Sequence, residues 1–253
     1  MIRGLYRAAS GMMAAQHRND VVADNLANVN TPGYKKDQGI AKTFEQELLV
    51  RIENASAGVP NAASIFPVGM VNSGVVLDQV VTVFSTGALT QTDSPTDLAL
   101  EGPGFFTVST PNGLRYTRSG SFRVDEAGSL VTGQGYQVMG TNGPVNGLPE
   151  SNFTVLSDGS VQASGQTINK LAIADFAPGM LLKEGDNLFS AQGQPIGDQN
   201  FRVKQKFLEQ SNVDTAEEMV NMMSALRGYE ANQKVIQTMD ASLEKAANEI
   251  GKI

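Results

Sequence analysis

The chain has 253 residues and a formal net charge of −7, and it contains one histidine, no cysteine and no tryptophan. These counts exclude a disulfide framework, a thiolate nucleophile and a multi-histidine metal centre. The acidic balance does not favour nucleic acid or anionic membranes as partners, and no apolar run reaches the roughly 18 residues that span a bilayer.

The N-terminal end of the chain predicts a long helix. Glycine and proline are scarce in residues 1–36 and concentrated in residues 37–211. Apolar residues recur at heptad spacing, and the helix is expected to end near Asn28, because Asn30–Gly33 has the composition of a turn. The seam residues expected to mediate assembly are Leu5, Ala8, Met12, Ala15, Asn19, Val22 and Leu26. Asn19 is the polar member of this seam, where a buried amide can fix register and partner number.

The middle of the chain predicts a mainly antiparallel β domain. Residues 37–74 predict a linker or extended segment, in which the apolar spacing also fits a short helix from Thr43 to Ile52. Further along, short runs rich in β-branched and aromatic residues alternate with turn sequences such as Asp158–Gly159. The predicted strands are 105–108, 114–117, 121–124, 153–155, 160–162 and 168–176.

Residues 212–253 predict a second long helix. Asp214 or Thr215 is the expected N-cap, with Glu217 or Glu218 completing a capping box. Two lanes at heptad spacing follow, one fully apolar and one partly apolar. The residues of these lanes expected to mediate assembly are Met219, Met222, Leu226, Tyr229, Ile236, Leu243 and Ile250.

The two ends carry opposite charge, +3 over residues 1–36 and −3 over residues 212–253, so they can pair. Exposed ion pairs contribute little, and the apolar seam must therefore hold them together. We expect an α+β fold in which N- and C-terminal helices form a discontinuous coiled-coil domain around an inserted antiparallel β domain. The expected division is 1–36 plus 212–253 for the helical assembly domain, 37–74 for the linker, and 75–211 for the β domain.

No residue pattern predicts catalysis or cofactor binding. His17, which a Ser-His-Asp site requires, lies on the N-terminal helix, and neither a G-x-S-x-G elbow nor a Walker lysine motif occurs. Acidic pairs such as Asp125 and Glu126 are interpreted as turn residues. Three neighbouring arginines are interpreted as part of a solvated sheet face: Arg115, Arg118 and Arg123. We expect no catalytic residue, cofactor, metal site or small-molecule substrate.

Several motifs carry a specific resemblance. At the N-terminal end they are ASGM at 9–12 and DNLANVNTPGYK at 24–35, and at the C-terminal end SNVD at 211–214, EMVN at 218–221 and RGYEAN at 227–232. In the middle stand LALEGPGFF at 98–106 and YTRSGSF at 116–122. With these motifs the chain resembles the bacterial flagellar rod and hook axial family, closest to the distal-rod type, with the proximal-rod type as the alternative. The motif residues that the resemblance assigns to assembly are Asn25, Leu26, Ala27, Asn28, Asn30, Thr31, Pro32, Gly33 and Tyr34.

The resemblance implies a non-enzymatic structural subunit of the flagellar basal-body rod, polymerising through its terminal helices into the torque-transmitting axial shaft. The implied partners are the chain itself, other rod, hook and basal-body proteins, and the flagellar type III export apparatus. Export would occur without a cleaved signal peptide, which agrees with the lack of an apolar run after Arg3 and Arg7. Phe44 and Leu48 resemble the short motif that the export gate reads, and an ordinary amphipathic turn is an equal alternative.

A competing hypothesis is a soluble protein whose β domain binds or cleaves peptidoglycan, with the helices as a private coiled coil. It requires an acidic pair in a cleft of that domain. No nucleic acid and no membrane span is expected under either hypothesis.

Overall fold

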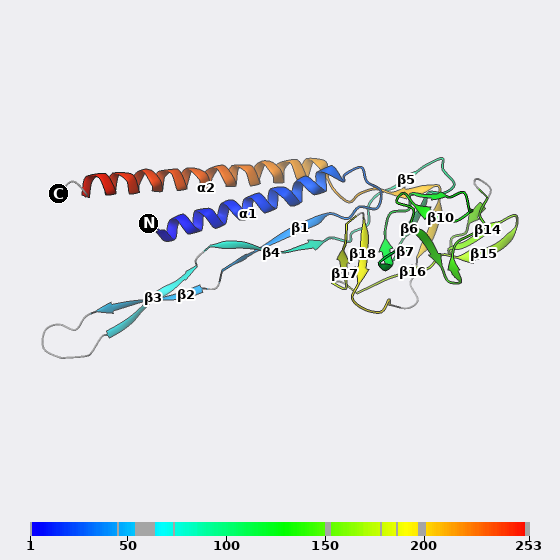
Figure 1. Ribbon diagram of the computed structural model, residues 1–253, viewed down its shortest axis with the longest axis horizontal. Helices are drawn as coiled ribbons and strands as arrows, with labels where there is room; N and C mark the ends of the chain where they lie inside the picture. The colour runs from blue at the N-terminus through cyan, green and yellow to red at the C-terminus, as the bar shows by residue number, and fades with distance from the viewer. Residues whose placement is uncertain are drawn as a thin grey trace. The chain divides into compact units, whose positions relative to one another are not determined.

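The computed structural model describes residues 2–44, 46–53, 64–72, 74–149, 153–177, 179–185, 187–196 and 201–250. They belong to two compact units. The helical unit comprises Met1–Asp24, Asp37–Val81 and Ala216–Ile253, and the β unit comprises Asn25–Lys36 and Thr82–Thr215. Two helices at the ends of the chain flank many short, mainly antiparallel strands, and this confirms the predicted α+β class (Figure 1).

The two helices begin and end close to the predicted residues. α1 spans Ile2–Ala27 and stops just before Asn28, while α2 spans Thr215–Ile250 and starts directly after Asp214. Glu217 and Glu218 lie in the first turn of α2, where the positive end of the helix dipole favours acidic side chains. Among the described residues, neither helix is long and apolar enough to cross a membrane.

Among the described residues, four strands follow the turn after α1 in the sequence. β1 (Asp37–Thr43) pairs with β4 (Val75–Thr82), and β2 (Gln46–Glu53) pairs antiparallel with β3 (Ser64–Asn72). The short helix predicted from Thr43 to Ile52 is therefore wrong. Its apolar residues recur every four positions, as in a helix, but pairing with β3 holds residues 46–53 in an extended strand.

The β unit is built on a sheet that has nine strands in the described part of the chain. The central order is β17-β18-β8-β7-β11-β10-β9, with β12 paired to β11 and β16 to β7. In chain order its strands are β7 (Phe105–Thr110), β8 (Gly113–Thr117), β9 (Phe122–Val124), β10 (Leu130–Thr132), β11 (Gln137–Gly140), β12 (Gly143–Pro144), β16 (Ile173–Ala174), β17 (Leu181–Lys183) and β18 (Leu188–Ala191). The strands predicted at 105–108, 114–117 and 121–124 are confirmed.

Three smaller sheets accompany the nine-stranded sheet in the described part of the β unit. They pair β13 (Phe153–Val155), β14 (Ser160–Ala163) and β15 (Gln166–Lys170); β19 (Arg202–Gln205) and β6 (Leu98–Glu101); and β20 (Phe207–Glu209) and β5 (Leu89–Gln91). The predicted hairpin at Asp158–Gly159 is confirmed between β13 and β14. The strand predicted over 168–176 is instead divided between β15 and β16, because the chain leaves one sheet and joins another.

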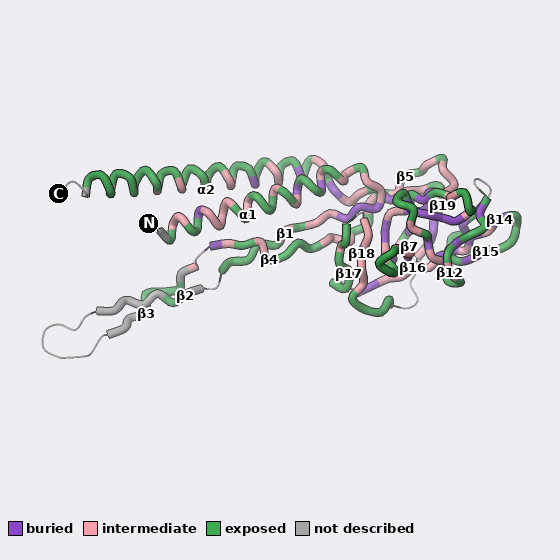
Figure 2. The backbone as a smooth tube through the Cα atoms, in the orientation of Figure 1, coloured by how far each residue is buried: buried purple, intermediate pink, exposed green. Residues whose placement is uncertain are grey.

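The main core lies in the β unit, where its strands are buried (Figure 2). One apolar cluster includes Leu98, Leu100, Phe106, Val108, Phe122, Leu130, Val138, Val145, Val161 and Leu171. A second, aromatic cluster contains Phe105, Phe176 and Phe189, with Phe84 and Tyr116 packed against it. These two clusters hold the segments that carry the site described below.

Candidate assembly site

In the helical unit α1 and α2 lie side by side (Figure 1), and small residues of both helices lie at their contact. Three pairs define the contact: Gly4 with Met239, Gly11 with Asn232, and Ala15 with Gly228. A methyl group added at Gly11 would lie 2.9 Å from Asn232 Nδ2, so the Asn232 side chain would have to shift to admit it. Residue numbers rise along α1 as they fall along α2, which makes the pair antiparallel.

All seven predicted seam residues of α1 are at least partly covered. Ala8 and Val22 are buried. The half-buried members are Leu5, Met12, Ala15, Asn19 and Leu26. Asn19 Oδ1 is buried, and it has no hydrogen-bond partner among the described residues. A polar seam residue of this kind lowers stability within the chain and is typical of positions that select a partner.

On α2 the predicted residues separate into two groups. Met222, Tyr229 and Ile236 are half-buried, whereas Met219, Leu226 and Leu243 are exposed, and the side chain of Ile250 lies outside the described residues. The second covered lane is displaced by one residue from the predicted one, and it consists of Glu218, Ala225, Asn232, Met239 and Ala246. The predicted lane and the covered lane both lie beside Met222 on a helix. The covered lane contains the small residue Ala225, which suits close packing against the small residues of α1. The part that Met219 and Leu226 take in assembly stays a prediction.

The N-terminal motif folds into a compact turn after α1, within the β unit. Asn25, Tyr34 and Lys35 are buried, and the Tyr34 hydroxyl donates to Asn25 Oδ1 at 3.2 Å. Gly33 has a φ of 70°, as expected for the glycine of this turn, and a methyl group there would collide with the backbone of Arg118. The other assigned residues, Leu26, Ala27, Asn28, Asn30, Thr31 and Pro32, are half-buried or exposed.

A buried ion triad fastens this motif to the β unit. Lys35 Nζ lies 2.5 Å from Glu209 Oε1, and Arg118 Nε lies 2.5 Å from Glu209 Oε2. All three side chains are at least 96% buried. Glu209 also accepts the Gly87 N–H at 2.9 Å, and Lys35 donates to Ser85 O at 2.8 Å. Every charged group of the triad therefore has several partners, which is the condition for keeping charges away from water.

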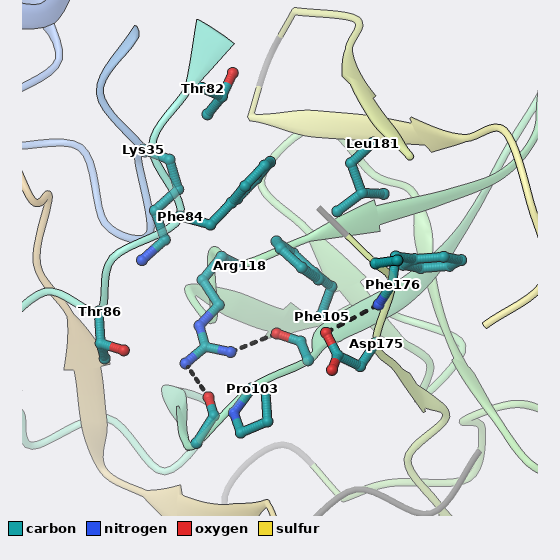
Figure 3. A pocket seen from close by; sticks show the side chains of 13 residues that line it. Lys35, Thr82, Phe84, Thr86, Pro103, Phe105, Arg118, Asp175, Phe176 and Leu181 are labelled. Atoms are coloured by element: carbon teal, nitrogen blue, oxygen red, sulfur yellow. Dashed lines mark hydrogen bonds between the residues drawn. The ribbon is translucent and has the colours of Figure 1, made fainter. Parts of the chain in front are cut away.

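Arg118 is the centre of this arrangement (Figure 3). Its guanidinium donates to the carbonyl oxygens of Leu100, Gly102 and Gly104, the first two at 2.9 and 2.7 Å. The planar fork of arginine suits several acceptors in fixed directions. The interpretation of Arg118 as part of a solvated sheet face is therefore wrong. It holds for Arg115, which forms a partly exposed pair with Glu184.

The triad shifts the pKa of two of its members. Burial lowers the pKa of Lys35, and the hydrogen bond and charge of Glu209 offset this only in part. Burial acts to raise the pKa of Glu209, but the positive charges and hydrogen bonds of Arg118 and Lys35 outweigh it, and the pKa of Glu209 is lowered. Glu209 is therefore held as a carboxylate at neutral pH.

The two terminal motifs meet beside this triad. Asn212, from the C-terminal motif, accepts the Lys36 N–H at 2.7 Å and donates to Val83 O at 2.8 Å. The Gly33 N–H donates to Glu209 O at 2.7 Å. Segments separated by about 175 residues are thus joined through hydrogen bonds that are largely shielded from solvent. No local sequence signal pairs Lys35 with Glu209, which is why sequence reasoning missed both.

A cavity of about 550 Å³ lies next to the triad (Figure 3). Lys35 and Arg118 form part of its wall, with their donors already engaged by Glu209 and by backbone carbonyls. The rest of the wall is mainly apolar and includes Phe84, Phe105, Phe176 and Leu181. Across the described residues, no group of three or more His, Asp or Glu side chains is placed to hold a metal ion.

The residues of the suggested export motif lie in the helical unit. Phe44 and Leu48 are exposed, on either side of the start of β2. Leu48 pairs with Met70 of β3. Both side chains are accessible, but on extended backbone rather than on an amphipathic helical turn.

Comparison with known proteins agrees with this architecture. Three family models match the chain: "Flagella basal body rod protein" over residues 5–35, "Flagellar hook protein FlgE/F/G D1 domain" over 99–165, and "Flagellar basal body rod FlgEFG protein C-terminal" over 204–249. The matched segments contain α1 with its motif, much of the β unit, and α2.

Full-length relatives agree as well. The chain is 38% identical to the flagellar hook-basal body complex protein FlhO of Bacillus subtilis, over the whole of both proteins. It is 36% identical to the flagellar basal-body rod protein FlgG of the same bacterium, covering 98% of this chain and 99% of that one. For FlgG of Borreliella burgdorferi the identity is 38%, with 98% of each chain covered. The peptidoglycan hypothesis gains no support from these relatives, and the chain belongs to the flagellar basal-body rod protein family as a structural subunit.

Proposed function

We propose that this chain polymerises through α1 and α2 into the axial shaft of the rod, which transmits torque, and that it has no catalytic activity. The observation that carries this proposal is the incomplete covering of the helices. α1 and α2 cover one face of each other, yet Met219 and Leu226 of the heptad pattern stay exposed. A further helix, from another copy of the chain, is the natural cover for such a face.

In this proposal the chain works as two parts. Residues 1–36 and 212–253 form the assembly domain, residues 75–211 form a β domain that packs outside the shaft, and residues 37–74 connect them. The buried triad holds the turn between α1 and β1 in the β unit, so residues 25–36 are the part of the assembly domain that joins it to the β domain. We propose the distal-rod type, because the residues Met1-Ile-Arg-Gly-Leu5 resemble that type.

The proposal is tested with a chain that ends after Thr215, which keeps Asn212 and its hydrogen bonds but lacks α2. We expect this chain to be secreted and to keep a folded β unit, yet to be absent from purified basal bodies. Full-length chain made at the same level is the control, and the amount secreted into the medium separates failed export from failed assembly. Incorporation of the shortened chain at the full-length level would refute assembly through α2.

We further propose that the flagellar type III apparatus exports the chain to the basal body outside the cytoplasmic membrane, without a cleaved signal peptide. The exposed Phe44 and Leu48 support recognition by the export gate. Replacing both by alanine should lower secretion, measured in the medium of cells that lack a completed hook. Alanine at Val68 and Met70, which are even more exposed and lie on β3, is the matched control and should leave secretion unchanged. Equal secretion of both variants would contradict the role of Phe44 and Leu48.

A further inference from the structure

Each terminal helix carries an exposed apolar face that its partner within the chain does not cover. On α1 this outer lane consists of Tyr6 and Met13. On α2 the outer stripe consists of Met219, Val220, Met223 and Leu226. These six side chains are between 48% and 66% exposed. Large apolar side chains at regular helical spacing indicate an interaction surface rather than scattered exposure.

The outer faces point away from the contact between α1 and α2. At about 100° per residue, Tyr6 and Met13 lie about 200° around the axis from Gly4 and Gly11, which touch α2. Met223 lies about 180° from Asn232 on α2 by the same geometry. Each helix can therefore keep its partner within the chain while it binds a second one.

The two outer faces match in length and in charge. Tyr6 and Met13 are seven residues apart, as are Met219 and Leu226, so each face extends about 10 Å along its helix. In an antiparallel arrangement that places Tyr6 beside Leu226, Met13 falls beside Met219. The same register brings exposed Arg3 next to exposed Glu230. A parallel arrangement would pair the same apolar residues, Tyr6 with Met219 and Met13 with Leu226, and would place Arg3 near the acidic first turn of α2. The direction of the two helices is therefore decided by the direction of the copies along the shaft.

We propose that the outer lane of α1 in one copy of the chain docks antiparallel onto the outer stripe of α2 in a second copy. The inference rests on the proposed function and specifies its contact surface. Since α1 and α2 are antiparallel within a chain, α1 of one copy is also antiparallel to α2 of any copy that points the same way along a shaft. Copies in the same orientation can therefore make this contact. The surfaces of the two copies differ, so the contact is heterologous and propagates.

The register predicts an axial step between neighbouring copies. Within one chain, Gly11 lies beside Asn232, and Gly4 beside Met239. Between chains, Tyr6 lies beside Leu226 in the proposed register, whereas within a chain the residue at the level of Tyr6 on α2 is eleven positions further on. The second copy is therefore displaced by eleven residues, or about 16 Å along the helices at 1.5 Å per residue. A displacement of this kind produces an open helical array rather than a flat ring.

The test uses the absence of cysteine from the natural chain. Full-length Tyr6→Cys and Leu226→Cys chains are produced together in the bacterium, basal bodies are purified, and disulfide-linked dimers are identified by mass spectrometry. A disulfide requires Cβ atoms about 4 Å apart, so only residues in contact are joined. In the matched control, Ser224→Cys replaces Leu226→Cys. Ser224 lies at nearly the same position along the axis of α2 as Leu226 but about 200° around the helix from it.

We expect dimers of Tyr6→Cys with Leu226→Cys to exceed those with Ser224→Cys by about tenfold, since geometry limits the reaction. Incorporation of both chains without excess dimers overturns the docking surface and leaves the rod function standing. Absence of the natural full-length chain from basal bodies overturns the rod function and the docking surface together. As a second readout, Met223→Asp should abolish incorporation while Ser224→Asp does not, and incorporation of both would also overturn the surface.

Discussion

Replacing Glu209 with glutamine tests the buried triad, because it keeps the shape of the side chain and removes its charge. In the natural chain this carboxylate lies within 2.5 Å of both Lys35 Nζ and Arg118 Nε, and it is 99% buried. Without it, two buried cations face each other with no anion between them. Breaking a buried ion pair on one side costs about 3–5 kcal/mol of the free energy of unfolding, and we expect Glu209→Gln to destabilise the β unit by that amount.

Lys35 has one way to reduce this loss. Its pKa is already lowered by burial, and removal of Glu209 takes away the group that opposes the shift. Lys35 should therefore lose its proton more readily in the variant. A base with a lowered pKa in the folded state gives stability that rises as the pH increases through that pKa, because the unfolded chain then binds more protons. The variant should recover part of its stability at alkaline pH.

Urea unfolding followed by tyrosine fluorescence measures the effect, since three of the five tyrosines, Tyr34, Tyr116 and Tyr136, lie in the β unit. Glu184→Gln is the matched control. It makes the same chemical change in the Arg115–Glu184 pair, which has the same 2.5 Å separation but is partly exposed, and its effect should be much smaller. Equal losses in the two variants would show that burial adds nothing to the contribution of the Glu209 carboxylate to stability.

Three other predictions follow from the described contacts. Gly228→Ala should stabilise α2 by up to about 1 kcal/mol in thermal unfolding followed by circular dichroism, because the added methyl group meets only Ala15 Cβ at 4.0 Å. A lower melting temperature would contradict the described packing of α1 against α2. Gly11→Ala is the contrasting variant, because its methyl group crowds Asn232. Gly33→Ala should cost at least about 1–2 kcal/mol in urea unfolding, since its φ is 70°, and an unchanged midpoint would be inconsistent with the turn. The pKa of Glu209 is lowered in the folded chain, so the stabilisation that this carboxylate provides should be present above its ordinary pKa of 4.5 and should be lost as the pH falls below that value. Identical stabilities of the natural chain and the Glu209→Gln chain from pH 3 to 7 would disprove this pH dependence.

The helices and hairpins could be predicted because their signals are local. Heptad spacing and the position of Asp214 located α2, and turn residues such as Asp158–Gly159 located hairpins. The segment 37–74 is predicted as a linker or extended segment, and the four-residue spacing of Phe44, Leu48 and Ile52 also fits a short helix that the described residues do not contain. The strand structure of β2 depends on β3, which begins eleven residues after β2 ends.

Long-range contacts explain the remaining differences. The displaced lane of α2 depends on the small residues of α1, since Ala225 and Met219 are equally placed beside Met222 on an isolated helix. The triad unites Lys35, Arg118 and Glu209 from three distant segments, and each residue taken alone is typical of a solvated surface. A weak signal for Arg118 was available in the sequence. The glycines at 102 and 104 leave the nearby backbone carbonyls open to its guanidinium.

Electron cryomicroscopy of rods isolated from the bacterium that makes this chain would test assembly through the terminal helices most directly. Assembly through the terminal helices predicts a tube in which α1 of each copy lies between α2 of its own chain and α2 of a neighbour, with the β unit outside it. Rods held together only by contacts between β units, with α1 and α2 unpaired across copies, would contradict such assembly.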